Sequence, residues 1–247
     1  MASKGYLSFV LHAHLPFVHH PESKDYLEEQ WLFEAISETY IPLLINFKKL
    51  EEEKVDFRLT MTITPTLLSM LDSKLLQERY IKYLEKHIEL CEKEVKRTVY
   101  DARLNRLSHY YLDRYSNDLH VFRDVYKCNL IQGFKHFQDA GYLEIITCGA
   151  THGYFPILYV NEKTVRAQIA VGVQTYEKYF GRKPRGIWLP ECGYVPEADK
   201  YLKEFGIEYT IVETHGVLYA DPTPIYGTYA PIVSHGGVVA FARDLEC

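Results

Sequence analysis

The sequence predicts an α/β fold built around a mostly parallel sheet, and three observations support this prediction. Six short runs rich in β-branched and aromatic residues recur along the 247 residues. Helical patterns separate these runs, and such alternation is typical of right-handed crossovers in a parallel sheet or barrel. Hydrophobic residues make up 47% of the chain and charged residues 25%, as in a folded domain with a substantial core.

The six expected strands are almost continuously apolar, which is the pattern of strands whose two faces are both buried. The last one is followed by only five residues, too few to cover it, so we expect the chain to be a truncated piece of a longer protein. The expected strands are residues 6–11, 57–62, 144–148, 186–189, 207–212 and 238–242.

Capping residues mark the expected helices between these strands. Asn161 precedes an apolar stripe that ends at Gly181, so we expect a helix over this span. Another helix is expected to begin near Pro196, which suits a first helical position, and to end at Gly206. The Thr-Pro pair at residues 64–65 opens a third, shorter helix.

One long stretch breaks the alternation of strands and helices. Residues 74–140 show helical periodicity and no strand signal. We therefore expect a helical insertion between the second and third strands, within one domain that spans residues 1–247.

Composition excludes several classes of protein. A net charge of −5 without a long Lys/Arg run makes nucleic-acid binding improbable. The apolar run at residues 6–11 is far shorter than the roughly 20 residues of a membrane-spanning helix and lacks a cleavage site. Five cysteines without a C-x-x-C pair indicate reduced thiols. We expect a cytoplasmic protein with no nucleic-acid or membrane partner.

Chemically distinctive residues gather where the expected strands end, which is where parallel α/β proteins carry their sites. His12 and His14 end the first strand, His152 follows the third, and Glu191 follows the fourth. We therefore expect these side chains to share one site. No glycine-rich nucleotide loop and no G-x-S-x-G motif occurs, which disfavours nucleotide binding and serine-hydrolase chemistry.

Glu191 is the strongest catalytic candidate. It follows an apolar strand and a proline, with Trp188 and Tyr194 three residues to either side. A carboxyl group among aromatic and apolar side chains can act as acid, base or nucleophile. The alternative is a glutamate that only complements the dipole at a helix N-terminus.

The histidines permit several interpretations. His12 and His14 are spaced i, i+2 on a strand and so point to one face, where with His152 they are candidates for a metal site. They suit hydrogen bonds to sugar hydroxyls equally well, or a purely structural role. The histidines inside expected helices are interpreted as structural, and these are His87, His109, His120 and His136.

Three motifs, in order, resemble those of glycoside hydrolase family 57 in the form typical of its 1,4-α-glucan branching enzymes. They are HAHLPFV at residues 12–18, ATHGYFP at residues 150–156 and WLPECGY at residues 188–194. The segment EQWLFEAISETY at residues 29–40 continues the likeness. The resemblance implies a distorted (β/α)7 TIM-like barrel, incomplete here and one strand short, with a helical insertion after the second strand. It further implies that residues 1–247 are part of a catalytic barrel domain whose remainder, with a helical domain, is absent.

The resemblance also implies roles for single residues. Glu191 matches the catalytic nucleophile, and Trp31 matches an aromatic residue beside the subsite where the sugar is cleaved. No metal and no other cofactor is expected. Arg243 joins the expected site because it follows the last expected strand. The expected substrate-binding residues are His12, His14, Trp31, His152, Trp188 and Arg243.

The implied reaction is retaining transfer or hydrolysis of α-1,4-glucans such as amylose, glycogen or starch, through a covalent glycosyl-Glu191 intermediate. The acid/base aspartate belongs to a motif beyond residue 247, and nothing matches Asp244 or Glu246 to it. We therefore expect this chain alone to be inactive.

Branching is the favoured activity, and three alternatives remain. The first is an α-amylase or 4-α-glucanotransferase on the same barrel. The second is a zinc-dependent hydrolase or deacetylase that uses His12, His14 and His152. The third is a glucan-binding relative without catalysis.

Overall fold

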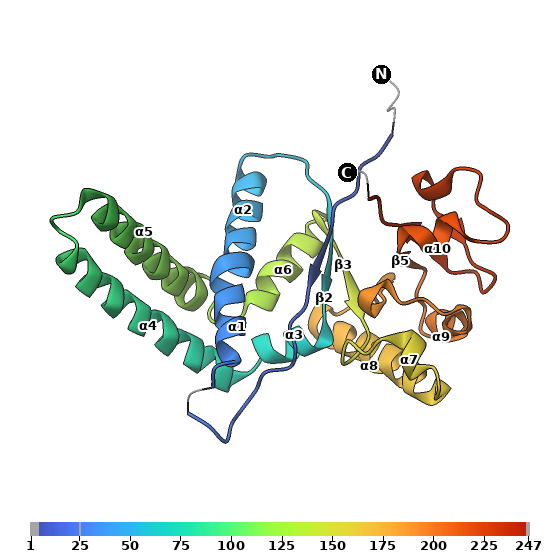
Figure 1. Ribbon diagram of the computed structural model, residues 1–247, viewed down its shortest axis with the longest axis horizontal. Coiled ribbons are helices and arrows are strands. Elements are labelled where there is room, and N and C mark those ends of the chain that lie inside the picture. The colour runs from blue at the N-terminus through green and yellow to red at the C-terminus, as the bar shows by residue number, and fades with distance from the viewer. Residues whose placement is uncertain (1–4, 25, 246–247) are drawn as a thin grey trace. The chain divides into compact units, whose positions relative to one another are not determined.

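The computed structural model describes residues 5–24 and 26–245, and its strands form one open sheet. Seven strands lie in the order β1-β2-β3-β4-β5-β7-β6, and β1, β2 and β3 run side by side in Figure 1. All neighbouring pairs are parallel except β6 with β7. The strands are β1 (Val10–Ala13), β2 (Leu59–Ile63), β3 (Leu143–Cys148), β4 (Gly186–Trp188), β5 (Tyr209–Val212), β6 (Ile232–Val233) and β7 (Val239–Ala242).

The predicted α/β class and its parallel sheet are confirmed, with two differences in detail. The first strand begins at Val10 rather than at Tyr6, whose side chain is 97% exposed. Val10 pairs with Thr60, and β2 begins only one residue earlier, so upstream residues find almost no partner strand. The strand β6 was not predicted, because two residues are too few to show a period.

The described chain divides into two compact units. Residues 5–16, 58–68 and 143–245 form the first unit, which holds the sheet. Residues 17–57 and 69–142 form the second unit, which is helical. Helices therefore follow the second strand, as expected, but the helical unit also takes in residues between the first two strands.

Three helices of the second unit, α4, α5 and α6, begin at side-chain caps. Ser73 caps α4 and Asp101 caps α5, and these two helices form the long hairpin in Figure 1. Two π-helical segments, Ile36–Tyr40 and His120–Val125, continue directly from α-helices. No helix in the described part of the chain has the length and hydropathy to span a membrane. The α-helices here are α1 (Glu29–Ala35), α2 (Ile41–Glu52), α4 (Lys74–Arg97), α5 (Ala102–Leu119) and α6 (Leu130–Asp139); α3 (Pro65–Leu71) contributes to both units.

In the first unit, α8 (Glu162–Phe180) confirms its predicted caps. The Asn161 side chain accepts a hydrogen bond from the Lys163 backbone N–H (3.1 Å), and Gly181 ends the helix with φ 71°. The apolar stripe of α8 is buried, and α9 (Asp199–Glu204) follows a short 3-10 turn, Pro196–Ala198. The other short helices are α7 (Phe155–Leu158) and α10 (Thr214–Leu218).

Gly172 allows α8 to approach the end of β3. A Cβ atom at Gly172 would lie 2.2 Å from the Cys148 carbonyl oxygen. Thr147 Oγ1 also donates a hydrogen bond to the Gly172 carbonyl (2.9 Å). The contact fixes α8 beside the strand end that leads to His152.

Substitution of Gly172 tests this packing. Gly172→Ala is expected to lower the free energy of unfolding by about 1–3 kcal/mol in urea titrations, because backbone must move to admit the methyl group. Gly216→Ala is the matched control, since that glycine lies in α10 with open space around it. Equal stability of the two variants would contradict the role of Gly172.

Asp118 is a buried carboxyl group near the end of α5 in the helical unit. It is 3% exposed, and burial raises its pKa to about 6. Ser37 lies against it, and the Ser37 hydroxyl is 2.7 Å from the Tyr80 hydroxyl. Arg114 donates a hydrogen bond to the Ser37 carbonyl (3.1 Å), so both π-helical segments adjoin one polar network.

This carboxyl group makes stability depend on pH. Because its folded pKa lies above the usual 3.8, ionisation costs folding energy progressively as the pH rises from about 4 through 6. Asp118→Asn should therefore raise the free energy of unfolding at pH 7 by up to about 3 kcal/mol and leave it nearly unchanged at pH 4. Urea titrations at both pH values measure this, and a gain of the same size at pH 4 would contradict it.

Candidate functional site

Four neighbouring parallel strands present their carboxyl ends at the same edge of the sheet, and each carries a polar residue there. His12 lies in β1 and Thr64 follows β2. His152 follows β3, and Glu191 follows β4. The strand order β1-β2-β3-β4 therefore gathers residues that are as many as 179 positions apart in the sequence.

The three expected site histidines form one cluster. The Nε2 atoms of His12 and His152 are 3.0 Å apart, within hydrogen-bond distance. The rings of His14 and His152 stack with centroids 3.7 Å apart and an interplanar angle of 9°. His14 Nδ1 lies 3.3 Å from the Thr64 hydroxyl.

Trp188 extends this cluster with an aromatic face. Its ring stacks on His12 at 4.7 Å with an interplanar angle of 20°. Trp188 is half-buried at the end of β4, three residues before Glu191. The arrangement therefore combines flat rings with ring nitrogens at one strand-end edge.

The histidines are neutral at pH 7. Burial, with the charges of His152 and His14, lowers the pKa of His12 to about 3. Burial and the charge of His152 lower the pKa of His14 to about 4. Burial also lowers the pKa of His152, although the Glu191 carboxylate opposes this shift. His12 retains exposed surface, but the rings on its flanks control the ionisation of its imidazole.

A titration of the imidazole resonances tests this neutrality. By NMR, His12 and His14 are expected to take up protons only near pH 3 to 4, with assignments from His12→Gln and His14→Gln. Because the folded pKa values lie below 6.5, the contribution of these two histidines to the free energy of unfolding should fall as the pH drops from 6.5 toward 4, opposite in sign to that of Asp118. Midpoints near 6.5 would show that the rings are not clustered in solution.

The cluster geometry does not favour the zinc alternative. In stacked parallel rings such as His14 and His152, the in-plane nitrogen lone pairs run side by side rather than converging on one point. Within residues 5–24 and 26–245, no group of three or more His, Cys, Asp or Glu side chains is arranged to hold a metal ion.

Glu191 lies on a turn with unusual backbone geometry. Its φ and ψ are 52° and 31°, and Cys192 has φ 53°, so both non-glycine residues are left-handed. Such conformations cost on the order of 1–3 kcal/mol each and cluster at functional sites. The Glu191 side chain is exposed, rather than enclosed by aromatic neighbours as the sequence predicts. Its turn is a 3-10 segment, Pro190–Cys192, and not the first turn of an α-helix.

Close packing supports the residues after Glu191. A Cβ atom at Gly193 would lie 2.3 Å from Tyr154 Cε2, so only glycine fits against that ring. The Tyr194 hydroxyl donates a hydrogen bond to Asp199 Oδ2 (2.9 Å), and Asp199 is buried. The second and third sequence motifs are thus in direct contact.

Arg243 follows β7, where it forms an ion pair with Glu213 at the end of β5. Thr214 Oγ1 donates a hydrogen bond to the Arg243 carbonyl (2.7 Å), which joins the two strand ends. Burial raises the pKa of the Cys192 thiol to about 11, and Glu213 and Arg243 both adjoin that thiol. Arg243 therefore neighbours the turn of Glu191, but Glu213 already engages its guanidinium group.

Glu213 was not singled out by the sequence, although its position offered a signal. It follows an apolar strand directly, as Glu191 does after its proline. Trp31 lies on α1 of the helical unit, where its side chain is 48% exposed. Glu246 and Cys247 lie outside the described residues, and four cysteines within them are free: Cys91, Cys128, Cys148 and Cys192.

Comparison with known proteins bears directly on this strand-end cluster. The family model of glycosyl hydrolase family 57 matches residues 8–246. The chain belongs to glycosyl hydrolase family 57. The resemblance carried by the three motifs is thereby confirmed, and their histidines and glutamate are the residues that meet at the sheet edge of this family-57 chain.

Individual relatives extend the comparison. A 1,4-alpha-glucan branching enzyme of Thermococcus kodakarensis is 38% identical over 98% of this chain and 39% of its own length. The alpha-amylase AmyC from Thermotoga maritima superposes with TM-score 0.94 at 49% identity, over 98% of this chain and 46% of that one. A GH57-type branching enzyme from Pyrococcus horikoshii gives TM-score 0.89 at 37% identity, over 99% and 48%. The family-57 chain thus spans less than half the length of these relatives.

Proposed function

We propose that this family-57 chain is the part of a retaining α-glucan enzyme that carries the nucleophile, Glu191. The position of Glu191 is the main support for this proposal. Its exposed side chain lies on a left-handed turn beside neutral histidines and the Trp188 ring. The Glu191 charge acts on His152, so the carboxylate and the histidine cluster belong to one site. The names of the relatives, which are α-amylases and branching enzymes, support a glucan as substrate.

The proposed reaction has two steps. The Glu191 carboxylate attacks the anomeric carbon of an α-1,4-linked glucose, and the bond to the leaving oxygen breaks as a glycosyl-Glu191 ester forms. A second carboxyl group, about 5–5.5 Å away in retaining enzymes, protonates the leaving oxygen. We expect it from a motif after residue 247. The same group then takes the proton from the acceptor, which displaces Glu191.

The neighbouring side chains have matching roles in this proposal. Neutral histidine rings each carry a donor and an acceptor, which suits the hydroxyl groups of glucose. The half-buried face of Trp188 beside His12 offers apolar surface to the C–H face of a sugar ring. Arg243 is proposed as a positioning residue through Glu213 and Cys192, and the role of Trp31 stays a prediction from the family resemblance.

The finer proposal is transfer to a glucan 6-hydroxyl, which creates an α-1,6 branch. Curated branching enzymes align over 98% of this chain, whereas curated α-amylases align over 32–38% of it. The solved α-amylase from Thermotoga maritima, at 49% identity, supports hydrolysis on the same framework. The acceptor, water or a hydroxyl group, is the only chemical difference between the two outcomes.

Product analysis of a longer protein that contains this chain tests the proposal. After incubation with amylose, enzymatic debranching should release new short chains, and Glu191→Gln should lower their formation at least about 10³-fold, because the nucleophile is lost. Glu197→Gln is the matched control, since that glutamate is exposed six residues further on. Unchanged activity of Glu191→Gln would show that Glu191 is not the nucleophile. New reducing ends without branches would show that the enzyme hydrolyses the glucan instead of branching it.

A further inference from the structure

A row of aromatic side chains lies along the α4–α5 hairpin of the helical unit. We define the aromatic seam as Tyr83 and His87 of α4 with Tyr110, Tyr111 and Tyr115 of α5. Ring centroids are 4.0 Å apart for Tyr83 and His87, and 5.1 Å for His87 and Tyr115. The row continues with Tyr111, 6.1 Å from Tyr115, and Tyr110, 5.3 Å from Tyr111.

The aromatic seam is open to solvent. Asp118 is the only buried residue of α5 in the described structure, so the helix leaves most of its surface uncovered. Tyr110 is 54% exposed and Tyr111 is 40% exposed, while the other three rings are half-buried. Two exposed rings that continue into three half-buried ones form a candidate binding surface.

Polar groups border the same rings. The Tyr83 and Tyr115 phenols interact with each other, and burial raises the pKa of both. Glu38 lies near both hydroxyls, and Arg114 lies near Tyr115 and interacts with Tyr110. The seam therefore combines apolar ring faces with hydrogen-bond donors and acceptors at their edges.

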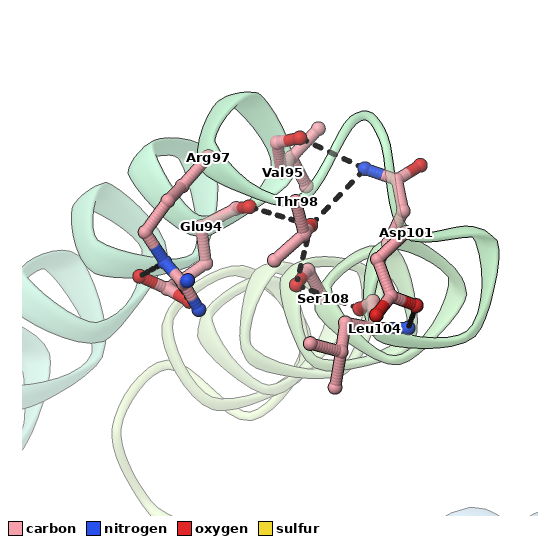
Figure 2. Close-up of polar contacts among 8 residues, drawn as sticks. Glu94, Val95, Arg97, Thr98, Asp101, Leu104 and Ser108 are labelled. Atoms are coloured by element: carbon pink, nitrogen blue, oxygen red, sulfur yellow. Dashed lines mark hydrogen bonds and ion pairs between the residues drawn. The ribbon is translucent and has the colours of Figure 1, made fainter.

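The hairpin holds these rings in a fixed arrangement. At its turn, Thr98 Oγ1 donates a hydrogen bond to the Glu94 carbonyl (2.7 Å), as Figure 2 shows. Asn105 Nδ2 donates to the Val95 carbonyl (2.8 Å) and to Thr98 Oγ1 (3.2 Å). The Asp101 side chain caps α5 at the same turn. Little ordering of α4 against α5 is then required when a ligand binds.

We propose that the aromatic seam binds an α-glucan chain, as a second site in addition to the strand-end cluster. The inference depends on the proposed function for the identity of the glucan. Glucose units present apolar C–H faces, which pack on aromatic rings, and hydroxyl edges, which hydrogen-bond to phenol, carboxylate and guanidinium groups. A neutral ligand also meets no charge penalty from Glu38 or Arg114.

One feature favours a glucan over a protein partner. A stable protein interface needs an apolar core depleted of charge within about 1,000 Å² or more, whereas here hydroxyls and ionised groups interrupt the rings. At its inner end the seam packs on the buried Phe33 ring of α1, 5.4 Å from Tyr83, which holds Tyr83 in place.

Native gel electrophoresis of residues 1–247 in gels that contain amylose or glycogen tests the seam. The double variant Tyr110→Ala/Tyr111→Ala is expected to bind about five- to tenfold more weakly, with circular dichroism to confirm the fold. Tyr100→Ala is the matched control, because Tyr100 is 99% exposed at the same hairpin but outside the seam. Tyr110→Ala alone, at the most exposed ring, should still weaken binding at least twofold and replaces the double variant if that does not fold.

Three results would overturn the inference. The first is that the glucan in the gel slows the migration of the double variant and of Tyr100→Ala to the same extent. The second is complete loss of retardation in His12→Ala/His152→Ala, which leaves the seam intact. The third is a change of molecular mass of the double variant in sedimentation without a change in glucan binding, which would make the seam a contact between two copies. Failure of the proposed function is distinguishable, because it would appear as full activity of Glu191→Gln in the longer protein.

Discussion

The parallel pairing of β1, β2, β3 and β4 is the constraint on which the site depends. Parallel strands end at the same edge, and the register Val10↔Thr60 and Thr60↔Glu144 sets how far each one extends toward it. A shift of one residue in β1 would turn the His12 side chain to the opposite face of the sheet. The close approach of α8 at Gly172 then fixes the end of β3. Strand register, rather than any local motif, therefore brings the histidines together.

Much of this framework could be predicted because its signals are local. Asn161 and Gly181 bound α8 as predicted, since capping and a left-handed helix end depend on a few adjacent residues. The prediction of a strand over residues 6–11 was wrong upstream of Val10, because the deciding contact is not local. These residues have the composition of a strand, but their pairing depends on where β2 begins, about 50 residues further along the chain.

The site residues also fall into two groups: those whose positions follow from local sequence signals, and those whose positions depend on distant contacts. The strand-end position of His12, His152 and Glu191 follows from alternation of strands and helices. The ion pair between Glu213 and Arg243 does not, because it joins residues 30 positions apart whose contact exists only through β5 and β7. The left-handed backbone of Glu191 was equally hidden, since glycine is the usual sign of that conformation and none stands there.

The contact between His12 and His152 has a consequence for proton placement. Two neutral rings that meet through their Nε2 atoms share one proton between them, so one ring donates it and the other accepts it. The donating ring then has a bare Nδ1, and the accepting ring carries its proton on Nδ1. Whichever tautomers form, the pair has one donor and one acceptor left over. A hydroxyl group can donate to a bare Nδ1 or accept from Nδ1–H, and the role that it takes at one ring fixes the tautomer of both, so the two histidines respond to a ligand as a single unit.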